Sequence, residues 1–246
     1  MFELTDVKKS FSGMFAPILN GVSLRIEPGE FCVLIGANGS GKSTLMKVIS
    51  GEHPVDAGRV TCDGGVAQVL QDVKLGTIAS MTLLENLVIS CVRKQRAAFS
   101  FYKRYKSDAI KKVEALGIGL EQYIDQPIGA LSGGQRQMIA TLMAVNSGSQ
   151  ILLLDEHTSA LDPKMQAKLM ENTANAVTEQ HLTTLMITHN MEDAVKYGDR
   201  LIMLHKGRIA LDIRGREKAS LDARSLVSLF HEIEDSAMFT REEPCL

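Results

Sequence analysis

The chain has 246 residues, and 45% of them are hydrophobic, so it can bury a full core as one large domain or as a domain with a subdomain. Its formal net charge of −2 argues against a nucleic-acid-binding protein, which usually carries a basic excess. The four cysteines have no paired spacing, which argues against a zinc site or a disulfide framework and indicates a reducing, cytoplasmic setting.

The first part of the chain predicts strands. The expected strands are, in order, 2–7, 21–26, 31–35, 58–62 and 66–70. Pro28-Gly29 is a hairpin signal before the third of these, and that strand is apolar throughout, which is typical of a strand covered on both faces. A glycine-rich loop follows it and leads into a helix from Ser43 to Gly51.

Helical patterns dominate from about residue 76 to 135, with helices expected at 82–92 and 107–116. We interpret this region as a helical subdomain inserted into an α/β core. Farther along, the predicted elements are a helix at 132–146, a strand at 151–154, a helix at 162–180, a strand at 183–187, a helix at 192–197, a hairpin arm at 200–204 turning at Lys206-Gly207, and a helix at 223–234. We expect one domain over 1–235 and a mobile tail over 236–246.

The glycine-rich loop has the spacing of a phosphate-binding loop, and it lies between a buried strand and a helix, as such loops do. Its predicted nucleotide-binding residues are Gly36, Asn38, Gly39, Ser40, Gly41, Lys42, Ser43 and Thr44. Glycines let backbone N–H groups turn toward phosphate oxygens, and the helix start adds its positive dipole end. Lys42 supplies a point charge for the β- and γ-phosphates, and the Ser43 hydroxyl is a candidate Mg²⁺ ligand.

Asp155 and Glu156 directly follow the apolar run 151–154, so both carboxylates are expected at the carboxyl end of a strand, where α/β sheets bind ligands. Asp155 is the expected Mg²⁺ holder, and Glu156 is placed to orient the attacking water. The alternative is that both carboxylates only cap the next element.

A third motif, Leu131-Ser132-Gly133-Gly134-Gln135, opens a predicted helix. The backbone N–H groups of Ser132, Gly133 and Gly134 cluster there, and the Ser132 side chain can cap the helix or donate a hydrogen bond. The motif is therefore a candidate anion-binding site, and no acidic side chain close to it in the sequence is expected to fill it.

With these three motifs in this order, the chain resembles an ATP-binding cassette (ABC) ATPase subunit over nearly all its length. The resemblance implies an α/β phosphate-loop fold with an ABC-type core sheet, an N-terminal antiparallel β-subdomain and an inserted helical subdomain. It also implies a head-to-tail homodimer, in which Ser132, Gly133, Gly134 and Gln135 reach the γ-phosphate of ATP bound to the opposite subunit.

Other positions are similar to known elements of the family. Gln71 resembles the glutamine that senses Mg²⁺ and links to the helical subdomain, and His189 resembles the switch histidine that contacts the γ-phosphate. Residues 159–162 resemble the loop that passes between the two ATP sites. Phe11 is the expected aromatic partner of adenine, Phe15 is a rival, and either could simply pack on the sheet.

Two positions depart from the usual family pattern. The segment 51–71 is shorter than is usual, which leaves the register of Gln71 open. His157 stands where proline often follows the catalytic glutamate, and it either tunes Glu156 or serves as a hydrogen-bonded spacer. Together with 158–163 and 187–194, it is similar to the branch associated with uptake of tryptophan or other aromatic amino acids.

A basic and aromatic segment lies between Arg93 and Lys112. It is either a solvated face with its aromatics in the subdomain core, or a surface that faces anionic lipid or a permease loop.

We therefore expect an ATP-hydrolysing, Mg²⁺-dependent subunit that powers transport through separate membrane permease subunits, together with an extracytoplasmic solute-binding protein. No apolar run approaches the ~20 residues of a membrane span and no signal segment is evident, so membrane attachment is expected through the permease, on the cytoplasmic face. The alternatives are an exporter subunit, a non-transport ABC ATPase acting on DNA or ribosomes, and a non-hydrolysing regulatory cassette.

Overall fold

The computed structural model describes residues 1–13, 15–91, 99–159 and 161–239. The chain divides into two compact units, and each is described by itself. The first unit comprises Met1–Asp63 and Thr183–Leu246, and the second unit comprises Gly64–Leu182. Among the described residues, none of the helices combines the length and the apolarity required to cross a bilayer.

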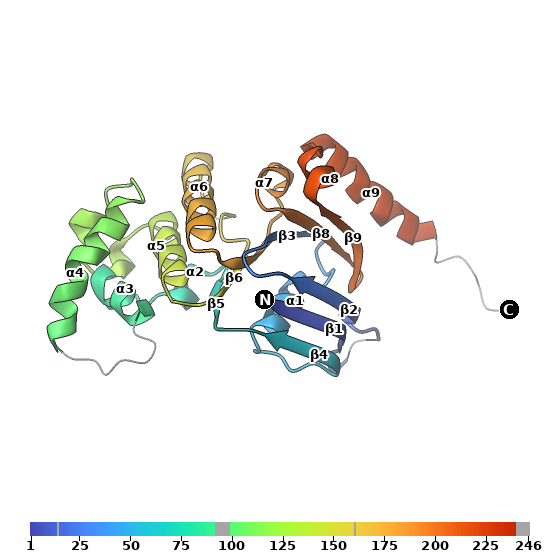
Figure 1. Ribbon diagram of the computed structural model, residues 1–246, viewed down its shortest axis with the longest axis horizontal. Coiled ribbons are helices and arrows are strands. Elements are labelled where there is room, and N and C mark those ends of the chain that lie inside the picture. Colours follow the sequence, from blue (N-terminus) through green and yellow to red (C-terminus); the bar gives the residue numbers. More distant parts are fainter. Residues whose placement is uncertain (14, 92–98, 160, 240–246) are drawn as a thin grey trace. The chain divides into compact units, whose positions relative to one another are not determined.

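The first unit contains a three-stranded antiparallel sheet in the order β2-β1-β4 (Figure 1). Its strands are β1 (Phe2–Lys9), β2 (Leu19–Ile26) and β4 (Ala57–Cys62). Phe2 lies opposite both Ile26 and Cys62. Burial alternates along β1 and shifts at Asp6, which has a φ of 46° and lies where the pairing register shifts. The predicted N-terminal antiparallel subdomain is thereby confirmed.

The predicted hairpin at Pro28-Gly29 is wrong. β2 pairs with β1, whereas β3 (Phe31–Ile35) lies in another sheet between β7 (Thr183–Ile187) and β8 (Arg200–His205). The burial of the two strands gives the reason. β2 keeps exposed residues, but every residue of β3 is buried, so the turn joins a one-faced strand to a strand covered on both faces.

Strands β7, β3 and β8 run parallel, and β9 (Arg208–Arg214) pairs antiparallel with β8. The β8–β9 hairpin turns at Lys206-Gly207, as predicted, with φ angles of 46° and 73°. Buried Arg200 ties this hairpin down: it donates to both Asp212 carboxylate oxygens, at 2.7 and 2.6 Å, and to the Arg25 carbonyl at 2.7 Å. One side chain therefore joins β8, β9 and β2.

The helices of the first unit are α1 (Lys42–Ile49), α7 (Met191–Lys196), α8 (Gly215–Ala219) and α9 (Ala223–Phe239). Of these, the sequence did not predict α8. α9 continues to Phe239, so the first four residues of the predicted tail are helical, and the rest of the tail lies outside the described residues.

The second unit combines a parallel pair, β5 (Val66–Val69) and β6 (Ile151–Asp155), with several helices (Figure 1). The helices are α2 (Val73–Gly76), α3 (Leu83–Cys91), α4 (Phe99–Glu114), α5 (Gly133–Val145) and α6 (Pro163–Glu179), with 3-10 turns at Glu121–Tyr123 and Ile128–Ala130. Helices α3 to α6 share an apolar core that includes Leu84, Val113, Met138, Ile139 and Leu169.

α4 begins eight residues before its predicted start at 107. The beginning of the basic segment lies outside the described part of the chain, which lacks residues 92–98. Farther along that segment, Lys112 pairs with Asp108 at 3.1 Å, and Lys106 pairs with Asp125.

Candidate active site

The glycine-rich loop joins β3 to α1 through a backbone that only glycine adopts readily. Gly36, Gly39 and Gly41 have φ angles of 151°, 80° and 108°. A Cβ atom at Gly36 would lie 2.3 Å from the Leu204 carbonyl oxygen, so the loop also packs on β8 too closely for a side chain. The curve of the loop therefore depends on these glycines.

Lys42 points back into the loop. Its buried ammonium Nζ donates to the carbonyl oxygens of Gly36, at 2.7 Å, and Ala37, at 2.9 Å. α1 starts at this residue, and its N-cap is Gly41, which has no side chain to accept the first helical N–H groups. A buried cation beside an uncapped helix start is a suitable environment for phosphate.

The other residues of the loop differ in their exposure. Asn38 and Ser43 are exposed, and Thr44 is half-buried. Ser40 is only 4% exposed, and its carbonyl accepts the Gly207 N–H at 2.9 Å, which fastens the loop to the β8–β9 turn. Its hydroxyl has no hydrogen-bond partner among the described residues.

At the end of β6, Asp155 and Glu156 are half-buried. Glu156 has a φ of 46°, a left-handed backbone that is uncommon for a residue with a side chain. Gln71, which follows β5, donates from Nε2 to Glu156 Oε2 at 3.4 Å. The parallel pairing of β5 with β6 therefore brings together two predicted site residues that are 85 positions apart.

His157 is 2% exposed, and burial lowers its pKa to about 4. The ring is neutral at pH 7, so it places no positive charge beside Glu156. Its Nε2 has no hydrogen-bond partner among the described residues.

Ser132 and Gln135 cap α5 reciprocally. Ser132 Oγ accepts the Gln135 N–H at 3.2 Å, and Gln135 Oε1 accepts the Ser132 N–H at 3.0 Å. The Ser132 N–H is thus already engaged, and this corrects the expectation that it joins Gly133 and Gly134 as an anion donor. A Cβ at Gly134 would lie 2.9 Å from Leu161 Cδ2, which limits what can replace this glycine.

His189 is exposed and follows β7. Phe11 is 37% exposed and packs edge-on against His53, with the Lys9 ammonium 5.5 Å from its ring centre. Phe15 is fully exposed. Phe11 therefore has an aromatic and a cationic neighbour in the described part of the chain.

The candidate residues fall into two groups. The first unit holds the phosphate loop, Phe11 and His189, and the second unit holds Gln71, Asp155, Glu156 and residues 132–135. Residue 160 of the predicted connecting loop lies outside the described residues. The Ser132 cap was one of the predicted roles of that side chain. The return contact from Gln135 was not predicted, although the Ser-x-x-Gln spacing signals it, and the Gln71–Glu156 contact has no local signal in the sequence.

The phosphate loop, the buried parallel strands and the carboxylates after β6 define a nucleotide-binding α/β ATPase. The family model described as "ABC transporter" matches residues 19–159, more than half of the chain. The chain belongs to the ABC transporter family, and it is an ATP-binding cassette ATPase.

Individual relatives agree with this assignment. The chain is 38% identical to the "Tyrosine transport ATP-binding protein" of Clostridioides difficile, over 94% of this chain and 98% of that protein. It is 33% identical to the "Aliphatic sulfonates import ATP-binding protein SsuB 1" of Nocardia farcinica, over 89% and 86%. Among solved structures, the dimeric post-hydrolysis state of the cassette MJ0796 with ADP and Pi has 27% identity and a TM-score of 0.74, over 87% of this chain and 98% of that one.

Proposed function

We propose that this chain is the ATP-hydrolysing subunit of an importer, and that it drives uptake of an amino acid, tyrosine or another aromatic one, through a separate permease. The observation that carries the proposal is the likeness to the tyrosine transport protein along almost the whole length of both chains. The other relative named above is an import protein by name, which favours import over export. We take residues 1–235 as one cassette domain with a helical subdomain at about 76–135.

In this proposal the phosphate loop binds ATP. The buried Lys42 ammonium exchanges its contacts with the Gly36 and Ala37 carbonyls for phosphate oxygens, and the first N–H groups of α1 bind the same anion. Lys42 thereby offsets the charge that develops during phosphoryl transfer.

The residues assigned to Mg²⁺ fit that ion chemically. Ser43, Gln71 and Asp155 offer a hydroxyl, an amide oxygen and a carboxylate, which are the oxygen donors that Mg²⁺ prefers. Gln71 and Asp155 flank the ends of the paired strands β5 and β6, and Ser43 is exposed near the start of α1. When bound, the ion would neutralise charge on the phosphate oxygens.

Glu156 is the proposed water-orienting base, and Gln71 already holds one of its carboxylate oxygens. His189 is the proposed γ-phosphate contact, and Phe11 the proposed adenine partner. Residues 132–135 are assigned to the ATP held by a second copy, so that a head-to-tail homodimer forms two composite sites. The dimeric cassette structure similar to this chain supports that assembly.

A permease segment needs an apolar place to dock, and the second unit has one. A cavity of about 310 Å³ lies between β5, α2, α3 and α5, with Val73, Ile89 and Met143 among its lining residues. Leu75 of α2 and Ile89 of α3 are exposed large hydrophobic side chains. We assign this surface to a cytoplasmic segment of the permease, which would hold the chain at the inner face of the membrane. A solute-binding protein would act through that permease.

Uptake in cells tests the proposal. Cells whose own copy carries Glu156→Gln should lose ATP-dependent accumulation of labelled tyrosine, phenylalanine or tryptophan, and uptake should return with the unchanged chain. Undiminished uptake of all three in the variant would contradict the proposed solute class, whereas loss of sulfonate uptake instead would reassign the importer.

A further inference from the structure

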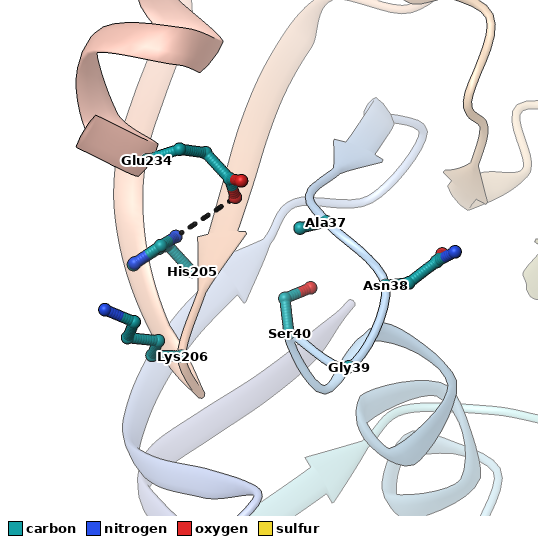
Figure 2. A pocket seen from close by; sticks show the side chains of 7 residues that line it. All are labelled: Ala37, Asn38, Gly39, Ser40, His205, Lys206 and Glu234. Atoms are coloured by element: carbon teal, nitrogen blue, oxygen red, sulfur yellow. Dashed lines mark ion pairs between the residues drawn. The ribbon is translucent and has the colours of Figure 1, made fainter. Parts of the chain in front are cut away.

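A second cavity lies in the first unit, against the phosphate loop. Its volume is about 220 Å³, and its lining residues come from the loop, the β8–β9 turn and α9: Ala37, Asn38, Gly39, Ser40, His205, Lys206 and Glu234. Figure 2 shows the Glu234 side chain reaching from α9 toward His205 and the loop. Asn38, Gly39 and Ser40 belong to the phosphate loop, whereas His205, Lys206 and Glu234 have no part in the phosphate chemistry or in the permease surface described above.

Three buried polar atoms that belong to lining residues have no hydrogen-bond partner among the described residues. They are Ser40 Oγ, His205 Nε2 and Glu234 Oε1. Ser40 is only 4% exposed, and the His205 and Glu234 side chains are 15% and 29% exposed. Buried polar atoms are almost always hydrogen-bonded, so three of them around one cavity make it a suitable place for a polar group.

The chemistry of these atoms restricts the occupant. His205 Nδ1 lies 3.5 Å from Glu234 Oε1 (Figure 2), an ion-pair contact without a hydrogen bond. In either tautomer, a neutral imidazole has one acceptor nitrogen. The carboxylate and the hydroxyl also accept hydrogen bonds. A primary ammonium group has three N–H donors and a positive charge that suits Glu234.

Size and neighbouring charge narrow the choice further. The cavity equals the volume of about seven water molecules at ~30 Å³ each, which leaves room for a solute of about ten non-hydrogen atoms or fewer. One imidazole and one carboxylate are fewer ligands than a zinc site requires. Lys206 also lines the cavity, so a carboxylate on the same solute would find a cation.

We propose that this cavity binds a small primary amine, and that Glu234, His205 and Ser40 hold its ammonium group. The amine is either a free amino acid or a simple amine without a carboxylate. Because Ser40 belongs to the phosphate loop, amine binding changes the affinity for MgATP, and MgATP changes the affinity for the amine by the same factor. The site thus gives the ATPase a way to respond to a metabolite that it does not hydrolyse.

Calorimetric titration of the full chain tests the proposal with three matched probes: leucine, 3-methylbutylamine (leucine without its carboxylate) and N-acetylleucine (leucine without its ammonium group). We expect leucine or the amine to bind saturably at millimolar concentration, and N-acetylleucine not to bind. Binding of both shows that the ammonium alone suffices, and binding of leucine alone shows that the carboxylate is also recognised.

Glu234→Gln should weaken binding at least tenfold, because it removes a charged hydrogen-bond partner. Glu232→Gln is the matched control, since Glu232 is exposed on the same helix. His205→Gln provides a second test if Glu234→Gln proves unstable on thermal unfolding. In labelled protein, the His205 ring nitrogens should shift with leucine or the amine.

The proposal is overturned if neither leucine nor 3-methylbutylamine binds, which would leave water as the occupant, or if N-acetylleucine binds equally well. An equal loss in Glu232→Gln also overturns it. An unchanged MgATP affinity in the presence of bound amine removes the coupling. MgATP binding in the same samples distinguishes the two proposals, because its absence contradicts the ATPase assignment and not the amine site.

Discussion

Two charged side chains, Lys42 and Glu156, carry most of the proposed chemistry, and each is held by neighbours in its own unit. Lys42 donates to two carbonyls of the loop it serves. Glu156 accepts from Gln71 and has a left-handed backbone. Backbone strain of this kind persists only where the surrounding structure enforces it, and it clusters at functional sites.

Glu156→Gln should retain MgATP binding and slow hydrolysis by about 100-fold or more, since a positioned general base contributes about 10²–10⁴-fold. Phosphate release and binding of a fluorescent ATP analogue measure the two quantities. Glu179→Gln, at an exposed position at the end of α6, is the control. Rapid turnover by Glu156→Gln would contradict the assigned role.

Lys42→Ala should weaken MgATP binding by about 10- to 100-fold, because a charged hydrogen bond contributes about 1.5–3 kcal/mol. MgATP should then raise the unfolding temperature less than it does in the unchanged chain at the same concentration. Lys47→Ala changes an exposed lysine of the same helix and should leave the shift intact. A full shift in Lys42→Ala would show that the loop binds phosphate without its lysine.

The secondary structure elements were predicted well wherever the sequence carries a local signal. Strand β3 and strand β7 match their predicted ranges, and α5 and α6 begin at Ser132 and Asp162 caps, because burial periodicity and capping are local properties. The partner of a strand is not a local property. The Pro28-Gly29 turn therefore resembled a hairpin, although it leads from one sheet to another.

Two substitutions of Ser132, the N-cap of α5, distinguish its contribution to stability from its proposed contact with phosphate. Ser132→Ala should lower the stability of the protein by about 1 kcal/mol, because it removes an N-cap. Ser132→Asp keeps a good N-cap and should keep that stability, yet it puts a negative charge where a phosphate is expected and should abolish hydrolysis. Denaturant unfolding and phosphate release distinguish the two variants, and normal hydrolysis by Ser132→Asp would refute the anion role.

The β8–β9 hairpin should be sensitive to acid. The hydrogen bond from Arg200 lowers the pKa of Asp212, so the stability that this carboxylate contributes is present above the ordinary Asp pKa of about 3.9. It is lost as the pH falls through the lowered value. Asp212→Asn should cost about 2–3 kcal/mol at pH 7, and its stability should fall less than that of the unchanged chain between pH 5 and pH 2. Urea unfolding as a function of pH checks both statements; parallel pH profiles would contradict the second.

At the scale of the whole molecule, the family was readable from three short motifs, and the comparisons agree. Two kinds of information could not be read from the sequence. The Gln71–Glu156 contact depends on the register of β5 with β6. The cavity at Ser40 depends on Glu234 of α9, which follows Ser40 by about 190 positions in the sequence. The identity of the transported solute also cannot be inferred from the residues that bind and hydrolyse ATP.

Mixing two inactive variants tests the composite sites. In a head-to-tail dimer of Lys42→Ala with Ser132→Asp, one site contains both defects and the other contains neither. The mixture should therefore hydrolyse ATP, although each variant alone does not. Phosphate release from the mixture measures this, and each variant alone at the same total concentration is the control. A mixture as inactive as its components would indicate that each chain works by itself.

The hydrogen bond from Gln71 to Glu156 has a kinetic consequence. An ionised carboxylate has about four lone-pair sites, so the amide of Gln71 leaves Glu156 able to accept from water but favours one orientation of its carboxyl group. Gln71 follows β5 and Glu156 follows β6, so a displacement of the stretch after β5 would alter this 3.4 Å contact and the orientation of the carboxyl group. The rate of ATP hydrolysis would then depend on where Gln71 lies, because that residue helps to set the direction in which Glu156 faces the attacking water.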